Sequence, residues 1–421
     1  MKYQDYKEYL SPVLAKSSDL VMKSGKGCYM TTIEGEEYLD FVQSIAVNAL
    51  GHCHPKVTEA AKGQIDKLIS GSFNLVNYEE TLKLSEKISK AAPGDLNVTF
   101  FSNGGAEATD GAIKLAKSAT GRPGIISFKG SFHGRTIAAT AVTGSNSKYR
   151  KNYEPMMPSV YFTSYPYCYR CPYETTCEKC SLQCMRELNE IFENLITPDS
   201  VAAIIMEPVQ GEGGYIVPPK KYIQKIREIC NEHGILLIFD EIQSGYGRTG
   251  KMFASEHFDV VPDIMTVGKA IAGGFPMSGI ISRKEIMDKW PVGTHGTTFG
   301  GHPVCAAAAN AVLDVFESDN VLDNCNKKGE YLKERLNEMK SKYPIIGDIR
   351  GLGLMIGVEL IKDDGGINSQ ARDAMLKHCK ENKLLMLGCG KNVVRFCTPL
   401  NIGKEDLDKG LAIFEDGLKS L

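Results

Sequence analysis

The amino-acid sequence predicts an α/β protein, with a large domain on a mostly parallel sheet of seven strands and a smaller α+β domain. The chain has 421 residues, enough for two domains with their own cores. Apolar runs alternate with helical patterns from about residue 60 to about residue 310, as in doubly wound α/β layers. The runs at 235–239 and 264–267 are nearly continuous in apolar residues, which is typical of parallel strands buried on both faces.

The elements are expected in the following order. The strands of the large sheet are predicted at 97–101, 124–128, 160–163, 202–206, 235–239, 264–267 and 279–282. Helical spacing predicts helices at 105–119, 219–233 and 303–317. The C-terminal part is expected to contain helices at 326–342 and 369–382, strands within 352–360 and 393–396, and a last helix from residue 404.

Charge and composition exclude several classes of function. Lys and Arg number 49 and Asp and Glu number 51, which gives a net charge of −2. This balance offers no electrostatic case for binding nucleic acid or an anionic membrane. The charged N-terminus lacks the apolar core of a signal peptide, and no apolar stretch approaches the roughly 20 residues of a membrane span. The 13 cysteines suggest a reducing compartment, so a cytoplasmic protein is expected.

Charged residues follow two of the predicted strands. Asp240 follows the run 235–239, and Lys269 follows the run 264–267 after one glycine. Ligands of open parallel sheets bind beyond the carboxyl ends of the strands, so both side chains are expected at one pocket. A buried carboxylate can hold a pyridinium nitrogen, and a desolvated lysine can form a Schiff base. Together they are the protein's part in pyridoxal phosphate chemistry.

Residues 240–250, Asp-Glu-Ile-Gln-Ser-Gly-Tyr-Gly-Arg-Thr-Gly, resemble the signature of the class III aminotransferases, and further motifs follow in that family's order from about Gly27 onward. The resemblance implies a fold-type I pyridoxal phosphate enzyme, in a group that includes 4-aminobutyrate and ornithine aminotransferases. It implies that residues 1–60 pack with a small domain at 321–421. Residues 61–320 would form the cofactor-binding domain, with a cysteine-rich insert at 165–185.

The resemblance also assigns residues to the cofactor. Gly105 and Ala106, between a strand and a helix, would receive the phosphate, since glycine and the free N–H groups at a helix start suit an anion. The family usually has Ser or Thr where this chain has Gly104, which puts one hydroxyl contact in doubt, and the Gly-Gly pattern alone favours a plain turn. The remaining cofactor residues would be Phe132 and Ile242 on the two ring faces, Gln243 at the phenolic oxygen, Asp240 at the ring nitrogen, and Lys269 as Schiff base and proton shuttle.

The remaining assignments concern the partner subunit and the substrate. Thr298 matches a threonine that reaches the cofactor phosphate of a partner subunit, which implies a homodimer, or a dimer of dimers, with active sites at the interface. Glu207 would lie near the ring and beside Arg135, whose guanidinium would bind a distal carboxylate. Glu212 would pair with Arg395 and swing away when Arg395 binds a 2-oxo acid. Ile45 matches a residue of the substrate pocket.

Five cysteines lie within 17 residues, at positions 168, 171, 177, 180 and 184. Cys168, Cys171, Cys180 and Cys184 have short spacings of the kind used by tetrathiolate zinc. A structural zinc at these four residues is therefore predicted. Free thiols, a redox disulfide and an iron–sulfur cluster remain alternatives. The insert resembles that of a subgroup that holds both aminotransferases and amino-acid racemases.

The motifs together favour transfer of the amino group of an ω-amino acid, 4-aminobutyrate first, to 2-oxoglutarate. The alternatives are a pyridoxal phosphate racemase or epimerase, an aminotransferase of 5-aminovalerate, ornithine or lysine, and a non-catalytic binding protein on the same fold. The sequence does not rank these amino donors, which differ mainly in length and end charge.

Overall fold

A seven-stranded sheet forms the centre of the larger domain in the computed structural model, which describes residues 2–173 and 180–421. The strand order is β4-β10-β9-β8-β7-β5-β6. β10 runs antiparallel to both of its neighbours, and the other pairs are parallel, so the predicted mostly parallel sheet is confirmed. The strands are β4 (Val98–Ser102), β5 (Gly124–Phe128), β6 (Val160–Thr163), β7 (Val201–Met206), β8 (Leu236–Asp240), β9 (Ile264–Val267) and β10 (Ser278–Ser282).

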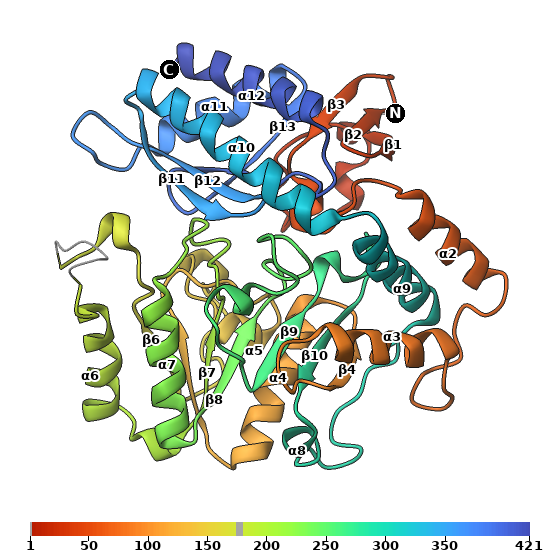
Figure 1. The fold of residues 1–421 in the computed structure, drawn as a ribbon, viewed down its shortest axis with the longest axis vertical. Helices are drawn as coiled ribbons and strands as arrows, with labels where there is room; N and C mark the ends of the chain where they lie inside the picture. Colours follow the sequence, from red (N-terminus) through yellow and green to blue (C-terminus); the bar gives the residue numbers. More distant parts are fainter. Residues whose placement is uncertain (1, 174–179) are drawn as a thin grey trace.

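Helices cover both faces of this sheet, as Figure 1 shows. The alternation of side chains along β7 decides which face each residue joins. Ala203 and Ile205 pack in one apolar cluster with residues of α4, whereas Ile204 and Met206 pack in another with residues of α6 and α7. The helices of this domain are α2 (Pro55–Ile65), α3 (Glu79–Ala91), α4 (Gly105–Thr120), α5 (Ile137–Ala141), α6 (Arg186–Asn194), α7 (Lys220–His233), α8 (Lys284–Met287) and α9 (Pro303–Ser318).

The two ends of the chain meet in a second layer above the large sheet (Figure 1). β3 pairs in parallel with β13, so the N-terminal sheet β1-β2-β3-β13 includes a C-terminal strand. A second sheet has the order β11-β12-β15-β14. The strands here are β1 (Met22–Lys26), β2 (Tyr29–Thr32), β3 (Glu37–Asp40), β11 (Ile346–Leu352), β12 (Met355–Leu360), β13 (Leu384–Leu385), β14 (Leu387–Cys389) and β15 (Val393–Phe396).

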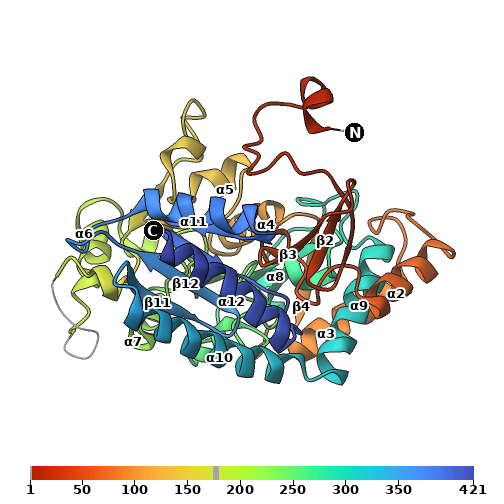
Figure 2. The ribbon, with the colours of Figure 1, turned by 90° about the horizontal axis from the view of Figure 1, so that it is seen from above.

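Three helices complete the C-terminal part: α10 (Val321–Lys342), α11 (Ser369–Glu381) and α12 (Lys404–Lys419). Seen from above, they lie side by side across the molecule, and the N-terminus extends away from its body (Figure 2). None of the helices in the described part of the chain is both long and apolar enough to cross a membrane.

Candidate active site

Three charged side chains lie at the carboxyl ends of adjacent parallel strands. Glu207 follows β7, Asp240 ends β8, and Lys269 follows β9 after Gly268. Because β7, β8 and β9 are paired in parallel, their carboxyl ends form one edge of the sheet. The fold thus brings together the three residues that the sequence predicted to be catalytic.

Asp240 is held by a full set of donors. The side chain is buried and accepts hydrogen bonds from Ile242 N (3.0 Å) and Thr266 Oγ1 (3.3 Å) at Oδ1. Oδ2 lies 2.6 Å from Nδ1 of His133. A buried carboxylate with such partners is fixed in direction as well as in charge.

His133 is the residue that the sequence motifs did not assign. It is buried, and its Nε2 has no hydrogen-bond partner in the described part of the chain. Burial disfavours the imidazolium, but the hydrogen bond and the negative charge of Asp240, with a further contribution from Glu207, outweigh burial and raise the pKa of His133. His133 therefore stabilises the ionised carboxylate of Asp240.

Lys269 has the setting of an amine that must lose its proton. Its side chain is half-buried, and the residue has a positive φ of 46° at the turn after β9. Burial lowers the pKa of Lys269, and the positive charge of Arg395 acts in the same direction, while Asp240 and Glu207 act against both. A lowered pKa favours the neutral amine, which is the form that acts as a nucleophile.

Glu207 lies close to this pair but has backbone partners. Its carboxylate accepts hydrogen bonds from Phe132 N (3.1 Å) and Gly211 N (2.9 Å). Burial raises the pKa of Glu207 to about 7, against the effect of the nearby His133. The expected neighbour Arg135 is exposed and makes no ion pair in the described part of the chain, so a Glu207–Arg135 contact is not found. The guanidinium of Arg135 instead lies 4.2 Å from the ring centre of Tyr149.

The residues assigned to the phosphate lie at the start of α4. Gly105 and Ala106 are the first two residues of this helix, so their N–H groups have no acceptor within the helix. Asn103 N and Gly104 N both donate to Glu107 Oε2, at 2.6 and 3.0 Å, which fixes the turn before the helix. A Cβ on Gly105 would lie 3.0 Å from the side chain of Ile242. The glycine therefore lets the helix start approach Ile242.

Phe132 and Gln243 are the remaining residues that the sequence assigned to the cofactor ring. The ring of Phe132 meets Tyr149 edge-on at 5.7 Å. The amide oxygen of Gln243 is buried without a hydrogen-bond partner in the described residues. The oxygen of Gln243 thus keeps a polar surface that no group of the described chain satisfies.

Ile45 and Thr298 are exposed in this single chain. Ile45 is 44% exposed and belongs to the turn α1 (Gln43–Ala46), in which all four residues have positive φ. Such left-handed backbone is strained for residues with a side chain. Thr298 is exposed next to Phe299, whose side chain is 59% exposed. Both residues therefore lie at the surface of the single chain.

Glu212 and Arg395 lie together, as the sequence predicted. Glu212 Oε2 is 3.4 Å from Arg395 Nη1, and Arg395 is only 4% exposed. Glu212 sits on a loop that Gln210 and Ile216 close with two backbone hydrogen bonds, whereas Arg395 comes from β15 of the C-terminal sheet. The pair therefore joins the two domains.

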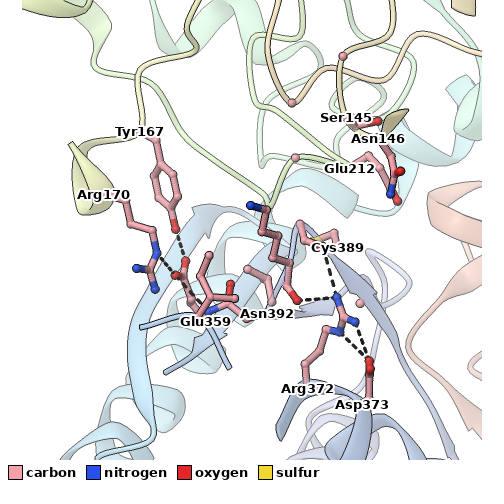
Figure 3. A pocket seen from close by; sticks show the side chains of 18 of the residues that line it. Ser145, Asn146, Tyr167, Arg170, Glu212, Glu359, Arg372, Asp373, Cys389 and Asn392 are labelled. Atoms are coloured by element: carbon pink, nitrogen blue, oxygen red, sulfur yellow. Dashed lines mark hydrogen bonds and ion pairs between the residues drawn. The ribbon is translucent and has the colours of Figure 1, made fainter. Parts of the chain in front are cut away.

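A cavity of about 860 Å³ opens beside Glu212 (Figure 3). It lies between the segments 144–149 and 388–393, and Tyr149 and Glu212 are both in its wall. Lys269 and Asp240 do not line it, so it adjoins the strand ends without containing them. Because Tyr149 also contacts Phe132 and Arg135, the cavity leads toward the predicted substrate residues.

The four cysteines predicted to bind zinc do not form a metal site. Among residues 2–173 and 180–421, no group of three or more His, Cys, Asp or Glu side chains could hold a metal ion. Cys168 is disulfide-bonded and has no thiolate to offer, while Cys171, Cys180 and Cys184 are free thiols. Burial, aided by Cys180, raises the pKa of Cys184 to about 11. The zinc prediction is therefore not supported, because close spacing in sequence did not bring four thiolates together. Cys177 lies outside the described residues.

Comparisons with known proteins agree with this geometry. The family model "Aminotransferase class-III" matches residues 12–418. The chain is 38% identical to a probable 4-aminobutyrate aminotransferase of Bacillus subtilis, over 98% of this chain and 96% of that one. It is 39% identical to a leucine/methionine racemase of Thermococcus litoralis, over 98% and 94% of the two chains. The fold matches that of a transaminase from the marine bacterium Virgibacillus with a TM-score of 0.91 and 31% identity, over 99% and 98% of the chains.

Proposed function

Because the chain belongs to the class III aminotransferases, which depend on pyridoxal 5'-phosphate, we propose that it transfers the amino group of an ω-amino acid to 2-oxoglutarate, with 4-aminobutyrate as the preferred donor. The observation that carries the proposal is the ion pair of Glu212 with the buried Arg395. While the carboxylate of Glu212 pairs with Arg395, an ω-amine can bind without an anion at this position. Once Glu212 moves aside, Arg395 can bind the carboxylate of a 2-oxo acid.

The residues at the strand ends fit the cofactor. Its ring nitrogen would face Asp240, its phosphate the start of α4 at Gly105 and Ala106, and its ring the side chains of Phe132 and Ile242. Two observations support this fit: the unpartnered polar atoms of His133 and Gln243 and the unused N–H groups at the helix start. When bound, the cofactor supplies a carbonyl that captures amines and a ring that withdraws electrons.

The chain's own part is to hold charge and to move one proton. Asp240, supported by His133, keeps a negative charge where the ring nitrogen must stay protonated. Lys269 is the amine that attaches covalently and then carries the proton to and from the substrate carbon, a task for which its lowered pKa suits it. Glu207, whose pKa burial raises to about 7, adds less than a full negative charge beside Asp240 near neutral pH.

The two arginines divide the work of carboxylate binding. Arg395 would hold the α-carboxylate of 2-oxoglutarate once Glu212 moves aside. Arg135, which Tyr149 holds by its ring face, would hold the carboxylate of 4-aminobutyrate. A planar guanidinium gives two parallel hydrogen bonds to a carboxylate and so fixes the substrate's direction.

The active unit in this proposal is a homodimer. Thr298 is exposed in the single chain and would reach the cofactor phosphate of the other subunit. Large apolar side chains are also exposed, among them Tyr9 (79%), Val13 (75%) and Leu75 (82%). Exposed apolar surface of this kind is typical of an interface between subunits.

Half-reaction kinetics test the proposed function. In Arg395→Ala, the 2-oxoglutarate half-reaction should slow by about a hundredfold or more, because a charged two-point contact is lost. The 4-aminobutyrate half-reaction should change by less than about tenfold, since its carboxylate binds Arg135. Arg135→Ala should show the reverse pattern. Stopped-flow absorbance measures each half-reaction separately, and Arg186→Ala, which removes an exposed arginine paired with Glu190, is the control.

A racemase is the second candidate, because the racemase relative is as similar in sequence as the aminotransferase relative. It makes different predictions. Only α-amino acids would react, loss of Arg395 would impair every substrate, and solvent deuterium would enter Cα without an oxo acid. Equal damage to both half-reactions in both arginine variants would contradict the division of labour and favour the racemase.

A further inference from the structure

Another buried carboxylate, that of Glu359 on β12, accepts hydrogen bonds from four donors on three segments of the chain. Its side chain is 1% exposed and accepts hydrogen bonds from Arg170 Nε at 2.5 Å, Arg350 Nη1 at 2.7 Å and Asn392 Nδ2 at 3.3 Å, and also from the hydroxyl of Tyr167. Burial alone would raise the pKa of Glu359, but these donors and the two guanidinium groups lower it. Glu359 is therefore an ionised group whose lone pairs are largely used.

Two of these donors come from the cysteine-rich segment. Tyr167 and Arg170 flank Cys168, and Figure 3 shows both side chains reaching across to Glu359 on the C-terminal sheet. The guanidinium of Arg350 also lies 4.8 Å from the ring centre of Tyr167. Tyr167 and Arg170, which flank one of the cysteines predicted to bind zinc, thus make a buried, charged contact with the C-terminal sheet.

A third donor ties Glu359 to the loop that carries Glu212. Arg350 uses its Nη1 for Glu359 and its Nε for the carbonyl of Gly214, at 2.9 Å. Gly214 has a φ of 133°, and a Cβ there would lie 3.1 Å from Arg350 Nη2, so glycine is needed for this approach. The carbonyl of Glu212 accepts a hydrogen bond from Gly390 N at 2.7 Å. The loop is therefore held from two points on the C-terminal domain.

The fourth donor ties Glu359 to the strand that carries Arg395. Asn392 directly precedes β15 and binds both Glu359 and the carbonyl of Leu360, the latter at 2.5 Å. In the ladder between β12 and β15, Glu359 is opposite Val393 and Gly357 is opposite Arg395. Glu359 is thus linked to both members of the Glu212–Arg395 pair. Arg350 connects it to the loop of Glu212, and Asn392 connects it to the strand of Arg395.

We infer that Glu359 is a positioning residue that sets the geometry of the Glu212–Arg395 pair, and that Tyr167 and Arg170 make the cysteine-rich segment part of this device. The consequence is specificity: the affinity for the α-carboxylate of a dicarboxylic oxo acid depends on Tyr167 and Arg170, which act on Arg395 through Glu359 and its partners. This inference rests on the proposed function in one respect, the assignment of that carboxylate to Arg395.

The test compares Tyr167→Phe, Arg170→Gln and Glu359→Gln with wild-type holoenzyme. Calorimetric titration with glutarate, an unreactive dicarboxylate, measures carboxylate binding apart from chemistry, and stopped flow measures the two half-reactions. Tyr167→Phe should weaken glutarate binding by about five- to tenfold, since one hydrogen bond to a charged group is lost. The 4-aminobutyrate half-reaction should change by less than about twofold, because Arg135 is outside this network. Glu359→Gln should have the larger effect, and if it does not fold, Tyr167→Phe decides.

Tyr169→Phe is the matched control. It removes a hydroxyl in the same turn, with its ring 6.4 Å from that of Tyr167, but contacts Glu359 through no hydrogen bond in the described structure. Unchanged glutarate affinity in Tyr167→Phe and in whichever Glu359 and Arg170 variants fold would overturn the inference, as would equal loss in both half-reactions. If wild-type enzyme has no 2-oxoglutarate half-reaction, the proposed function fails, and the glutarate titration still decides the inference.

Discussion

Lys269→Ala should abolish covalent attachment of the cofactor and lower turnover by at least about 10⁴-fold, since the variant loses both its nucleophile and its proton carrier. Lys269 follows β9 at the edge where Glu207 and Asp240 also lie. Burial lowers the pKa of Lys269 below that of a surface lysine, which favours the neutral amine that attacks a carbonyl.

Two measurements check this result. Borohydride treatment followed by mass spectrometry should locate the fixed cofactor on Lys269 in the wild type and on no residue of the variant, and the visible absorbance of the attached cofactor should vanish with it. Lys251→Ala, which removes an exposed lysine just after the 240–250 signature, should behave as wild type. A cofactor fixed at another lysine in Lys269→Ala would refute the assignment.

Residues at the ends of apolar runs were predictable from the sequence, because the same apolar run indicates both that the strand is buried and where it ends. A run such as 235–239 can be a strand only if it is buried, and a charge at its carboxyl end must then face the ligand edge. Asp240 and Lys269 follow from this reasoning. The boundaries shifted by one residue at β4 and β8, because strand ends depend on pairing such as that of Ser102 with Ser278, which no single segment encodes.

Partners that meet only after folding were not predictable in the same way. The contact of His133 with Asp240 joins the loop after β5 to the last residue of β8, and nothing in the motif around His133 specifies it. Glu359 had a usable signal: an acidic residue inside the buried strand β12 must find donors, because an unpaired buried charge is costly. Which donors it finds depends on a segment from the other domain.

The cysteine spacing misled for a physical reason. Short separations along the chain allow four thiolates to converge, but they do not require it, because the backbone between them decides where each sulfur lies. Here Cys168 is disulfide-bonded, and the neighbouring Tyr167 and Arg170 are directed to Glu359. Tyr167 and Arg170 are thus held by a buried carboxylate of the C-terminal sheet, a partner that spacing alone cannot reveal.

Asp240→Asn should bind the cofactor but lose about a hundredfold or more in rate, because the substitution keeps the shape of the side chain and removes the charge that holds a proton on the ring nitrogen. The amide oxygen of Asn can still accept from Ile242 N and Thr266 Oγ1, which now bind Oδ1, so folding should be little affected. His133 provides a readout that does not depend on turnover. Since Asp240 raises the pKa of His133, its loss should lower that pKa.

Nuclear magnetic resonance titration of the His133 ring, together with single-turnover rates, tests this prediction. The sign is fixed by charge: a nearby anion favours the imidazolium. With a neutral Asn only the smaller effect of Glu207 opposes burial, so the ring loses its proton at lower pH. A fallen His133 pKa with a near-normal single-turnover rate would show that the ion pair exists without a role in catalysis. A lost rate with unchanged cofactor binding and a fallen His133 pKa would establish Asp240 as the charge on which the chemistry depends and His133 as the residue that supports it.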